Sequence, residues 1–155
     1  MTLQTATHQR TTTWDAPRLI GVLLSLVGMA DAGYLSWLHL NDTIAAGCST
    51  GSGCDIVQHS VYSEIAGVPI ALLGLAGFAT ILLALLLDGM LDDWGRLATL
   101  GVSLIGVLYS AYLTYVELFV LRAICPYCVA SALFMVGLLW VAVTRARPIL
   151  LEPQD

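Results

Sequence analysis

The stretch AICPYCVASALFMVGLLWVAV (residues 123–143) joins a Cys-Pro-Tyr-Cys pair to an apolar run that contains no charged residue. In a soluble protein such a pair suggests a thioredoxin-like redox centre. Here Pro126 suits the first turn of a helix, where its missing N–H costs nothing. The run that follows approaches the roughly 20 helical residues needed to cross about 30 Å of hydrocarbon. We therefore predict a membrane helix that carries a dithiol at its N-terminal end.

The composition of the whole chain supports a membrane protein. Of its 155 residues, 58% are hydrophobic and 11% are charged, whereas soluble domains carry about 25% charged residues. Three further apolar stretches are long enough to cross a bilayer, at about Pro17–Leu40, Gly67–Leu87 and Leu97–Val120. The sequence therefore predicts an all-α integral membrane protein, a four-transmembrane-helix bundle. A net charge of −5 without a basic stripe argues against a nucleic-acid partner.

The arginines predict the orientation of the bundle. With four spans, five of the six arginines fall on the side of the two termini and the 88–96 loop, and only Arg122 falls opposite. The positive-inside rule makes the first side cytoplasmic, so that the loop at 41–66 and the turn at 121–125 face outward. We expect a disordered cytoplasmic tail at 1–16, a membrane domain at 17–145 and a second cytoplasmic tail at 146–155.

All four cysteines lie on or beside the two outward segments. Cys125 is expected near the N-cap of the last helix, where the positive helix end lowers the pKa of a thiol. Cys128 lies on about the same face but deeper toward the membrane. Cys48 and Cys54 enclose GCSTGSGC (residues 47–54), a small, polar stretch without packing residues. The first pair suits a relay between water and membrane, and the second suits a shuttle disulfide more than a structural staple.

The two outward-going helices end in similar sequences. GYLSWLHL (residues 33–40) resembles AYLTYVEL (residues 111–118), and a cysteine pair follows each. The similarity indicates either a parallel duplication of a helix–dithiol–helix unit or two helix ends that share an aromatic interface belt.

The stretch DIVQHSVYSEI (residues 55–65) predicts a short helix on the membrane surface. Its apolar face at helical spacing is formed by Ile56, Val57, Val61 and Ile65. Ser60 falls within this face, and its hydroxyl either bonds back to its own helix or points at a polar headgroup. Of the acidic residues near the spans, Glu117 is interpreted as structural and Asp31 has no assigned role.

Together these features resemble the bacterial form of the vitamin K epoxide reductase family. The resemblance covers about residues 17–145. It rests on four spans, the C-x₅-C loop pair, CDIVQHSVYSEIAGVPIALLG (residues 54–74) and AICPYC (residues 123–128). It implies a four-helix bundle around a quinone in the bacterial inner membrane. Many bacterial members carry a fused thioredoxin-like domain, and this chain ends at Asp155 without one, so its thioredoxin-fold partner is expected to be a separate protein.

The resemblance also implies catalytic roles for the cysteines. By position, Cys48 exchanges with the partner and Cys54 passes electrons to Cys125. Cys128 then faces the quinone ring, beside which Ser60 matches a family hydroxyl. The predicted quinone-binding residues are Ser60, Tyr112, Tyr115 and Ala132.

Two positions depart from the vertebrate pattern. An Asn and a Tyr of vertebrate members align with Ile70 and Ala132, which are both apolar. This difference favours a plain quinone, ubiquinone or menaquinone, over vitamin K epoxide as the acceptor.

We therefore expect a membrane thiol:quinone oxidoreductase that generates disulfides de novo for the oxidative folding of exported proteins, without a metal. Two rival classes use the cysteines structurally. One is a transporter or channel subunit, which would normally show several polar residues at mid-depth. The other is a scaffold with a Cys₄ zinc site, for which the C-x₅-C spacing is long.

Overall fold

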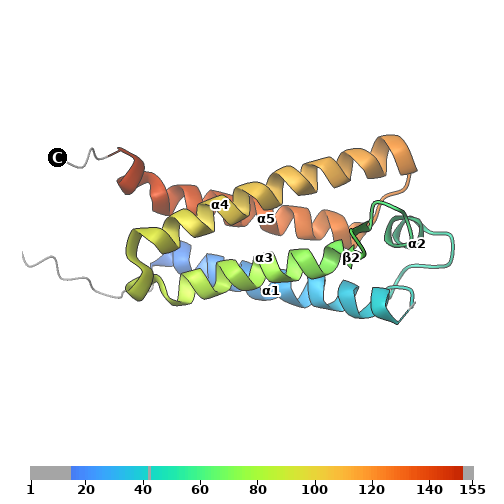
Figure 1. The fold of residues 1–155 in the computed structure, drawn as a ribbon, viewed down its shortest axis with the longest axis horizontal. Helices are drawn as coiled ribbons and strands as arrows, with labels where there is room; N and C mark the ends of the chain where they lie inside the picture. The colour runs from blue at the N-terminus through green and yellow to red at the C-terminus, as the bar shows by residue number, and fades with distance from the viewer. Residues whose placement is uncertain (1–14, 42, 152–155) are drawn as a thin grey trace, which may run out of the picture.

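The protein is a bundle of four long helices, and a computed structural model describes residues 15–41 and 43–151. The four helices are α1 (Ala16–Leu40), α3 (Ile70–Leu86), α4 (Asp88–Tyr115) and α5 (Pro126–Leu151). They run side by side along the long axis of the molecule (Figure 1). Helix α1 packs against α3 and α5, and α4 packs against the same two helices, so that the four close a ring.

The centre of the bundle is apolar, and so is much of its outer surface. The buried cluster consists of Val22, Ala32, Phe78, Ile81, Leu85, Met135 and Leu138. Large apolar side chains also cover the outside of the helices, among them Leu23, Ile105 and Trp140. Soluble proteins rarely expose apolar surface on this scale, whereas lipid tails are as apolar as leucine. The outer surface is therefore suited to contact with lipid.

Three helical segments are long and apolar enough to cross a membrane, namely Ala16–Leu40, Asp93–Leu121 and Pro126–Arg147. Helix α3 is also apolar but has 17 residues, which span about 26 Å at 1.5 Å per residue. This length is slightly below the roughly 30 Å of the hydrocarbon layer. The fold is thus that of a mostly helical membrane protein, and the fourth span stays a prediction.

The surface helix predicted over 55–65 is only partly present. Helix α2 covers Gly53–Gln58, and an antiparallel hairpin of β1 (Glu64–Ile65) and β2 (Val68–Pro69) follows. The hydroxyls of Ser60 and Ser63 each donate to a carbonyl three residues earlier, at 2.8 Å. Such bonds favour turns over continued helix. The hairpin turn at 66–67 has two residues with positive φ, as a type I′ turn requires.

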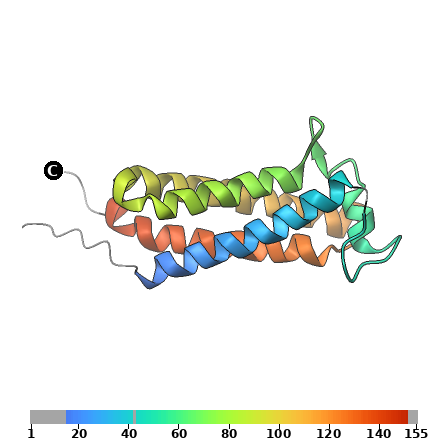
Figure 2. The ribbon, with the colours of Figure 1, turned by 90° about the horizontal axis from the view of Figure 1, so that it is seen from below.

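Both cysteine-bearing segments lie at one end of the bundle, opposite the α3–α4 connection and the ends of the described chain (Figures 1 and 2). Helix α4 begins at Asp88, so the loop predicted at 88–96 is helical. Helix α5 continues to Leu151, so the part of the predicted C-terminal tail at 146–151 is helical as well. The remaining parts of the predicted tails, 1–14 and 152–155, lie outside the described residues.

Candidate active site

Two cysteine pairs occupy the same end of the bundle in different redox states. The loop pair, Cys48 and Cys54, forms a disulfide with Cα atoms 6.2 Å apart. The helix pair, Cys125 and Cys128, consists of two free thiols. In an electron relay, this arrangement corresponds to a helix pair that is reduced and a loop pair that is oxidised. The disulfide also leaves the loop pair without thiolates for a Cys₄ zinc site.

A backbone contact beside Cys54 holds the loop against the start of α5. A Cβ added at Gly53 would lie 2.2 Å from the carbonyl oxygen of Ile124, so only glycine permits this approach. Cys54 is 3% exposed, and Cys125, which follows Ile124, is fully buried. The structure therefore brings the residues next to Cys54 and Cys125 into contact, although they are far apart in sequence.

Two tyrosines hold the other side of the loop. The N–H of Ala46 donates to Tyr34 Oη at 2.9 Å, and Tyr127 Oη donates to the carbonyl of Ala46 at 2.7 Å. The two aromatic rings lie 5.9 Å apart. Because Tyr127 stands between Cys125 and Cys128, the C-x-x-C motif carries the reactive sulfurs and also anchors the loop. Sequence inspection did not assign this role to Tyr127.

Cys125 directly precedes α5, as predicted, but it is buried instead of near water. Its N–H donates to Oε2 of Glu117 at 3.3 Å, and the N–H of Cys128 donates to its sulfur at 3.4 Å. A hydrogen bond from the Cys128 thiol lowers the pKa of Cys125, and the N–H groups of Cys128 and Tyr127 add to this effect. Burial and the Glu117 carboxylate oppose it, but the net shift of the pKa is downward. Cys125 is therefore set to react as a thiolate.

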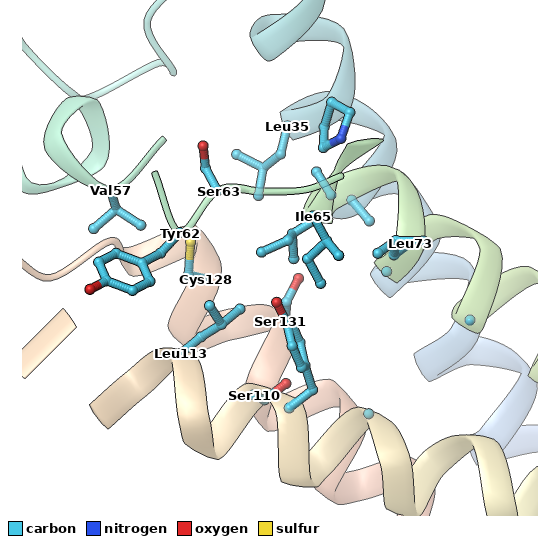
Figure 3. A pocket seen from close by; sticks show the side chains of 18 of the residues that line it. Leu35, Val57, Tyr62, Ser63, Ile65, Leu73, Ser110, Leu113, Cys128 and Ser131 are labelled. Carbon is cyan, nitrogen blue, oxygen red and sulfur yellow. The ribbon is translucent and has the colours of Figure 1, made fainter. Parts of the chain in front are cut away.

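Cys128 lies in the wall of a cavity of about 370 Å³. Figure 3 shows its sulfur among the side chains that line this cavity, with Ser131 further along α5. Most lining side chains are apolar, as Leu35, Leu73 and Leu113 illustrate. The size falls within the range of about 300–1,000 Å³ that is typical of small-molecule sites. An apolar ring compound suits these walls, and it would meet the sulfur of Cys128 there.

Of the predicted quinone-binding residues, Ser60 lines the cavity. Its hydroxyl donates to its own segment at 2.8 Å. Tyr112 and Tyr115 are 49% and 57% exposed on the outside of α4 and are not part of the lining. Ala132 also lies outside the lining. The face of α5 toward the cavity carries residues at a helical spacing of three and four, namely Cys128, Ser131 and Met135.

Gln58 and Glu117 are among the polar residues of the lining that were not predicted as site residues. Gln58 lines the cavity, and its Nε2 is buried without a hydrogen-bond partner within the described parts of the chain. Glu117 also lines the cavity and is 3% exposed. It lies in η1 (Val116–Leu121), a π-helical continuation of α4, and π-helical turns are frequent at functional sites. No sequence pattern singled out Gln58, and an acidic residue near a span was the only signal for Glu117.

Asp31 accepts a hydrogen bond from the hydroxyl of Ser131. The bond joins α1 to α5 inside the bundle, beside the cavity wall that Ser131 forms. Hydrogen bonds between membrane helices contribute about 0.6 kcal/mol on average. Asp31 therefore helps to hold α1 against α5.

A dithiol in the wall of an apolar cavity, a second cysteine pair docked beside it and membrane-length helices define a membrane-embedded thiol–disulfide protein. The model of the Vitamin K epoxide reductase family matches residues 19–143. The chain therefore belongs to this family of oxidoreductases, whose members in general generate disulfides in membranes with quinones as electron acceptors.

Proposed function

We propose that this chain is a thiol:quinone oxidoreductase that makes disulfides for the folding of exported proteins. The proposal rests mainly on the placement of the helix pair. Cys128 lies in the wall of the apolar cavity, and Cys125 is buried where the loop that carries Cys54 packs. A structural staple has no need of a thiol in a ligand-sized cavity or of a second pair docked beside it.

Exposure supports a direction of electron flow through the four cysteines. Cys48 is partly exposed, whereas Cys54 is 3% exposed. A partner thiolate attacks Cys48, and Cys54 leaves as a thiolate. Cys54 then attacks Cys125 of an oxidised helix pair, which frees the thiolate of Cys128. The second thiolate of the partner closes the partner's own disulfide and releases Cys48, and Cys48 attacks Cys54, which restores the loop disulfide and frees the thiolate of Cys125. Each exchange passes through a mixed disulfide, so access and thiolate fraction set its rate.

The cavity suits a quinone, which when bound would accept two electrons from the helix pair and take up two protons. The apolar lining would hold the ring beside Cys128. The unpartnered Nε2 of Gln58 is a donor for a carbonyl oxygen, and Ser60 stays a predicted neighbour of the ring. Tyr112, Tyr115 and Ala132 stay predictions that the cavity geometry does not support.

Redox potentials favour a strong acceptor of this kind. Thiol oxidants of the bacterial periplasm have potentials near −120 mV, and about 30 mV corresponds to 1.4 kcal/mol for two electrons. Glutathione-type couples near −200 mV would therefore run the reaction backward. Ubiquinone or menaquinone is the acceptor that a membrane location makes available.

The proposed setting is the bacterial inner membrane, with α3 as the fourth span. The cysteine end of the bundle then faces the periplasm or cell exterior, and both termini face the cytoplasm. The predicted excess of arginine on the side of the termini supports this orientation. The proposed electron donor is a thioredoxin-fold dithiol that docks at the loop pair.

The proposal can be tested with the protein purified in detergent. A reduced thioredoxin-fold dithiol protein and a short-chain quinone are added, and the quinone absorbance is followed. We expect wild type to consume quinone and Cys128→Ser to lose this activity. A wild type that consumes no quinone would falsify the proposal, and so would unchanged consumption by Cys128→Ser.

The role of the loop pair is tested by comparing two electron donors. Cys48→Ser and Cys54→Ser should lose turnover with the protein partner, because the shuttle is broken. A small dithiol that reduces the helix pair directly should still support quinone consumption in both variants. Equal losses with both donors would refute the shuttle assignment.

A further inference from the structure

Glu117 lies at the point where the reacting groups of the proposed function meet. Helix α4 changes at Val116 into the π-helical segment η1, which ends at Leu121 before the turn into α5. Glu117 is the only acidic residue of this segment and is 3% exposed. It also lines the cavity that Cys128 lines. The carboxyl group therefore borders both the helix pair and the space for the electron acceptor.

The polar contacts of Glu117 are made with the helix pair. Its Oε2 accepts the N–H of Cys125 at 3.3 Å, and its side chain lies close enough to that of Cys128 to interact with it. The thiol of Cys128 is thus near two groups that can accept its proton, the sulfur of Cys125 and the carboxylate of Glu117. Within residues 15–41 and 43–151, no ion pair joins Glu117 to an arginine or histidine.

A carboxyl group in this position is costly unless it has a task. Ionisable side chains inside membrane proteins are rare and often form proton relays. The reduction of a quinone consumes two protons, and the apolar cavity walls offer few groups that can carry one. A group that takes the proton of Cys128 and faces the acceptor can supply one of the two.

We propose that Glu117 is a catalytic proton carrier, which takes the thiol proton of Cys128 and delivers it to an oxygen of the quinone. This inference rests on the proposed function, because it assigns a residue to the same quinone-reducing step.

The step balances in atoms and electrons. The S–S bond between Cys125 and Cys128 forms, both S–H bonds are lost, and two electrons pass to the quinone. The proton of Cys128 moves to Glu117 and from there to one quinone oxygen. The other oxygen takes a proton from water, equal to the one that Cys125 released on becoming a thiolate. The sum is dithiol plus quinone giving disulfide plus quinol.

The variant Glu117→Gln separates proton transfer from hydrogen bonding. The amide oxygen can still accept the N–H of Cys125, but the side chain can no longer carry a proton. Reduced protein is mixed with a short-chain quinone, and a single turnover is followed by absorbance. We expect the quinone step to slow about 10²-fold, in line with the usual effect of general acid–base groups. Formation of the mixed disulfide between the reduced partner protein and Cys48 of the oxidised variant, without quinone, should stay within about twofold of wild type, because this attack takes place at the loop pair and not at the helix pair that Glu117 contacts.

A second measurement needs no quinone. In protein whose other three cysteines are serine, Cys128 is the only thiol, and its reaction with N-ethylmaleimide reports proton loss from its sulfur. We expect Glu117→Gln to speed this reaction roughly tenfold, because alkylation follows the thiolate fraction and a neighbouring carboxylate disfavours a second negative charge on the sulfur. An unchanged rate would mean that the carboxylate does not face the sulfur of Cys128.

The control is Asp93→Asn, which removes a carboxylate near the start of α4, whereas Glu117 lies beyond the end of this helix. The Asp93 side chain is 54% exposed. This substitution should leave both rates unchanged. The proposal is overturned if Glu117→Gln reduces quinone at the wild-type rate, or if its Cys128 reacts with N-ethylmaleimide no faster than the Cys128 of the protein that keeps Glu117. If Glu117→Gln does not fold, Glu117→Asp and Glu117→Asn repeat the comparison, and equal rates in these two overturn the proposal. A wild type that reduces no quinone instead refutes the proposed function itself.

Discussion

The contact between Gly53 and Ile124 makes a sharp test of the relay, because a single methyl group disturbs it. In Gly53→Ala the new Cβ would lie 2.2 Å from the carbonyl oxygen of Ile124 and 2.9 Å from its C and N atoms. All three are backbone atoms, so no side-chain rotation relieves the clash. Ordinary contacts begin near 3.4 Å, so the loop must move away from α5 by about 1.2 Å.

The displacement acts on the transfer between the loop pair and the helix pair. Overpacking of this kind costs about 1–3 kcal/mol, and a misplacement of about 1 Å can slow a reaction about 10²-fold. We expect quinone consumption with the reduced partner protein to fall about 10- to 100-fold. Direct reduction of the helix pair by dithiothreitol should support wild-type quinone consumption, because this route bypasses the loop.

The assay follows quinone absorbance with each of the two electron donors. Mass spectrometry checks that the disulfide between Cys48 and Cys54 still forms. Gly101→Ala is the matched control, since a Cβ at that position has no atom within 4 Å. Wild-type turnover of Gly53→Ala with the protein partner would show that the close packing beside Cys54 does not serve electron transfer. An equal loss with both donors would refute the reasoning as well, because the change would then act on the helix pair itself.

Three other outcomes can be measured. Alkylation of Cys125 should speed up with rising pH around a midpoint below the ordinary thiol pKa of about 8.5. Cys128→Ala should move this midpoint upward, because the hydrogen bond that lowers the pKa of Cys125 is lost while burial remains. An unchanged midpoint in mass-spectrometric rate measurements would contradict this account. Gln58→Leu should raise the KM for quinone roughly 2- to 10-fold through loss of a buried donor, whereas Ser63→Ala, whose hydroxyl is already bonded to backbone, should not. Arg18→Leu should lower the unfolding free energy in detergent by about 1.5–3 kcal/mol, because the guanidinium donates to the last carbonyls of α3 at 3.0 and 3.3 Å. A loss below about 0.5 kcal/mol, the range of neutral surface changes, would contradict this role.

The local part of the fold could be predicted from the sequence. Apolar runs of membrane length are a property of consecutive residues, and three of the four predicted spans, at about 17–40, 97–120 and 126–143, match helices that can cross a bilayer. The start of α5 at Pro126 also followed from local chemistry. The surface helix at 55–65 was less secure, since its apolar spacing competed with serine hydroxyls that bond to nearby carbonyls and end the helix early.

The candidate site was predicted in part. The four cysteines were evident because two pairs stand beside membrane segments, and the disulfide of the loop pair joins neighbours in sequence. Tyr112 and Tyr115 were predicted to bind the quinone, but the sequence does not tell which side of their helix faces the cavity. The structure turns both outward and places Tyr109 in the lining instead.

The sequence by itself determined that this is a helical membrane protein with two dithiols, because hydropathy, helix length and cysteine spacing are local. Only the tertiary structure decided how the dithiols meet, since Gly53 and Ile124 touch through folding and not through sequence proximity. It also decided that Cys125 is buried, that Cys128 faces a cavity and that Glu117 lies beside both. These are distances between separate helices, and they arise only when the bundle closes.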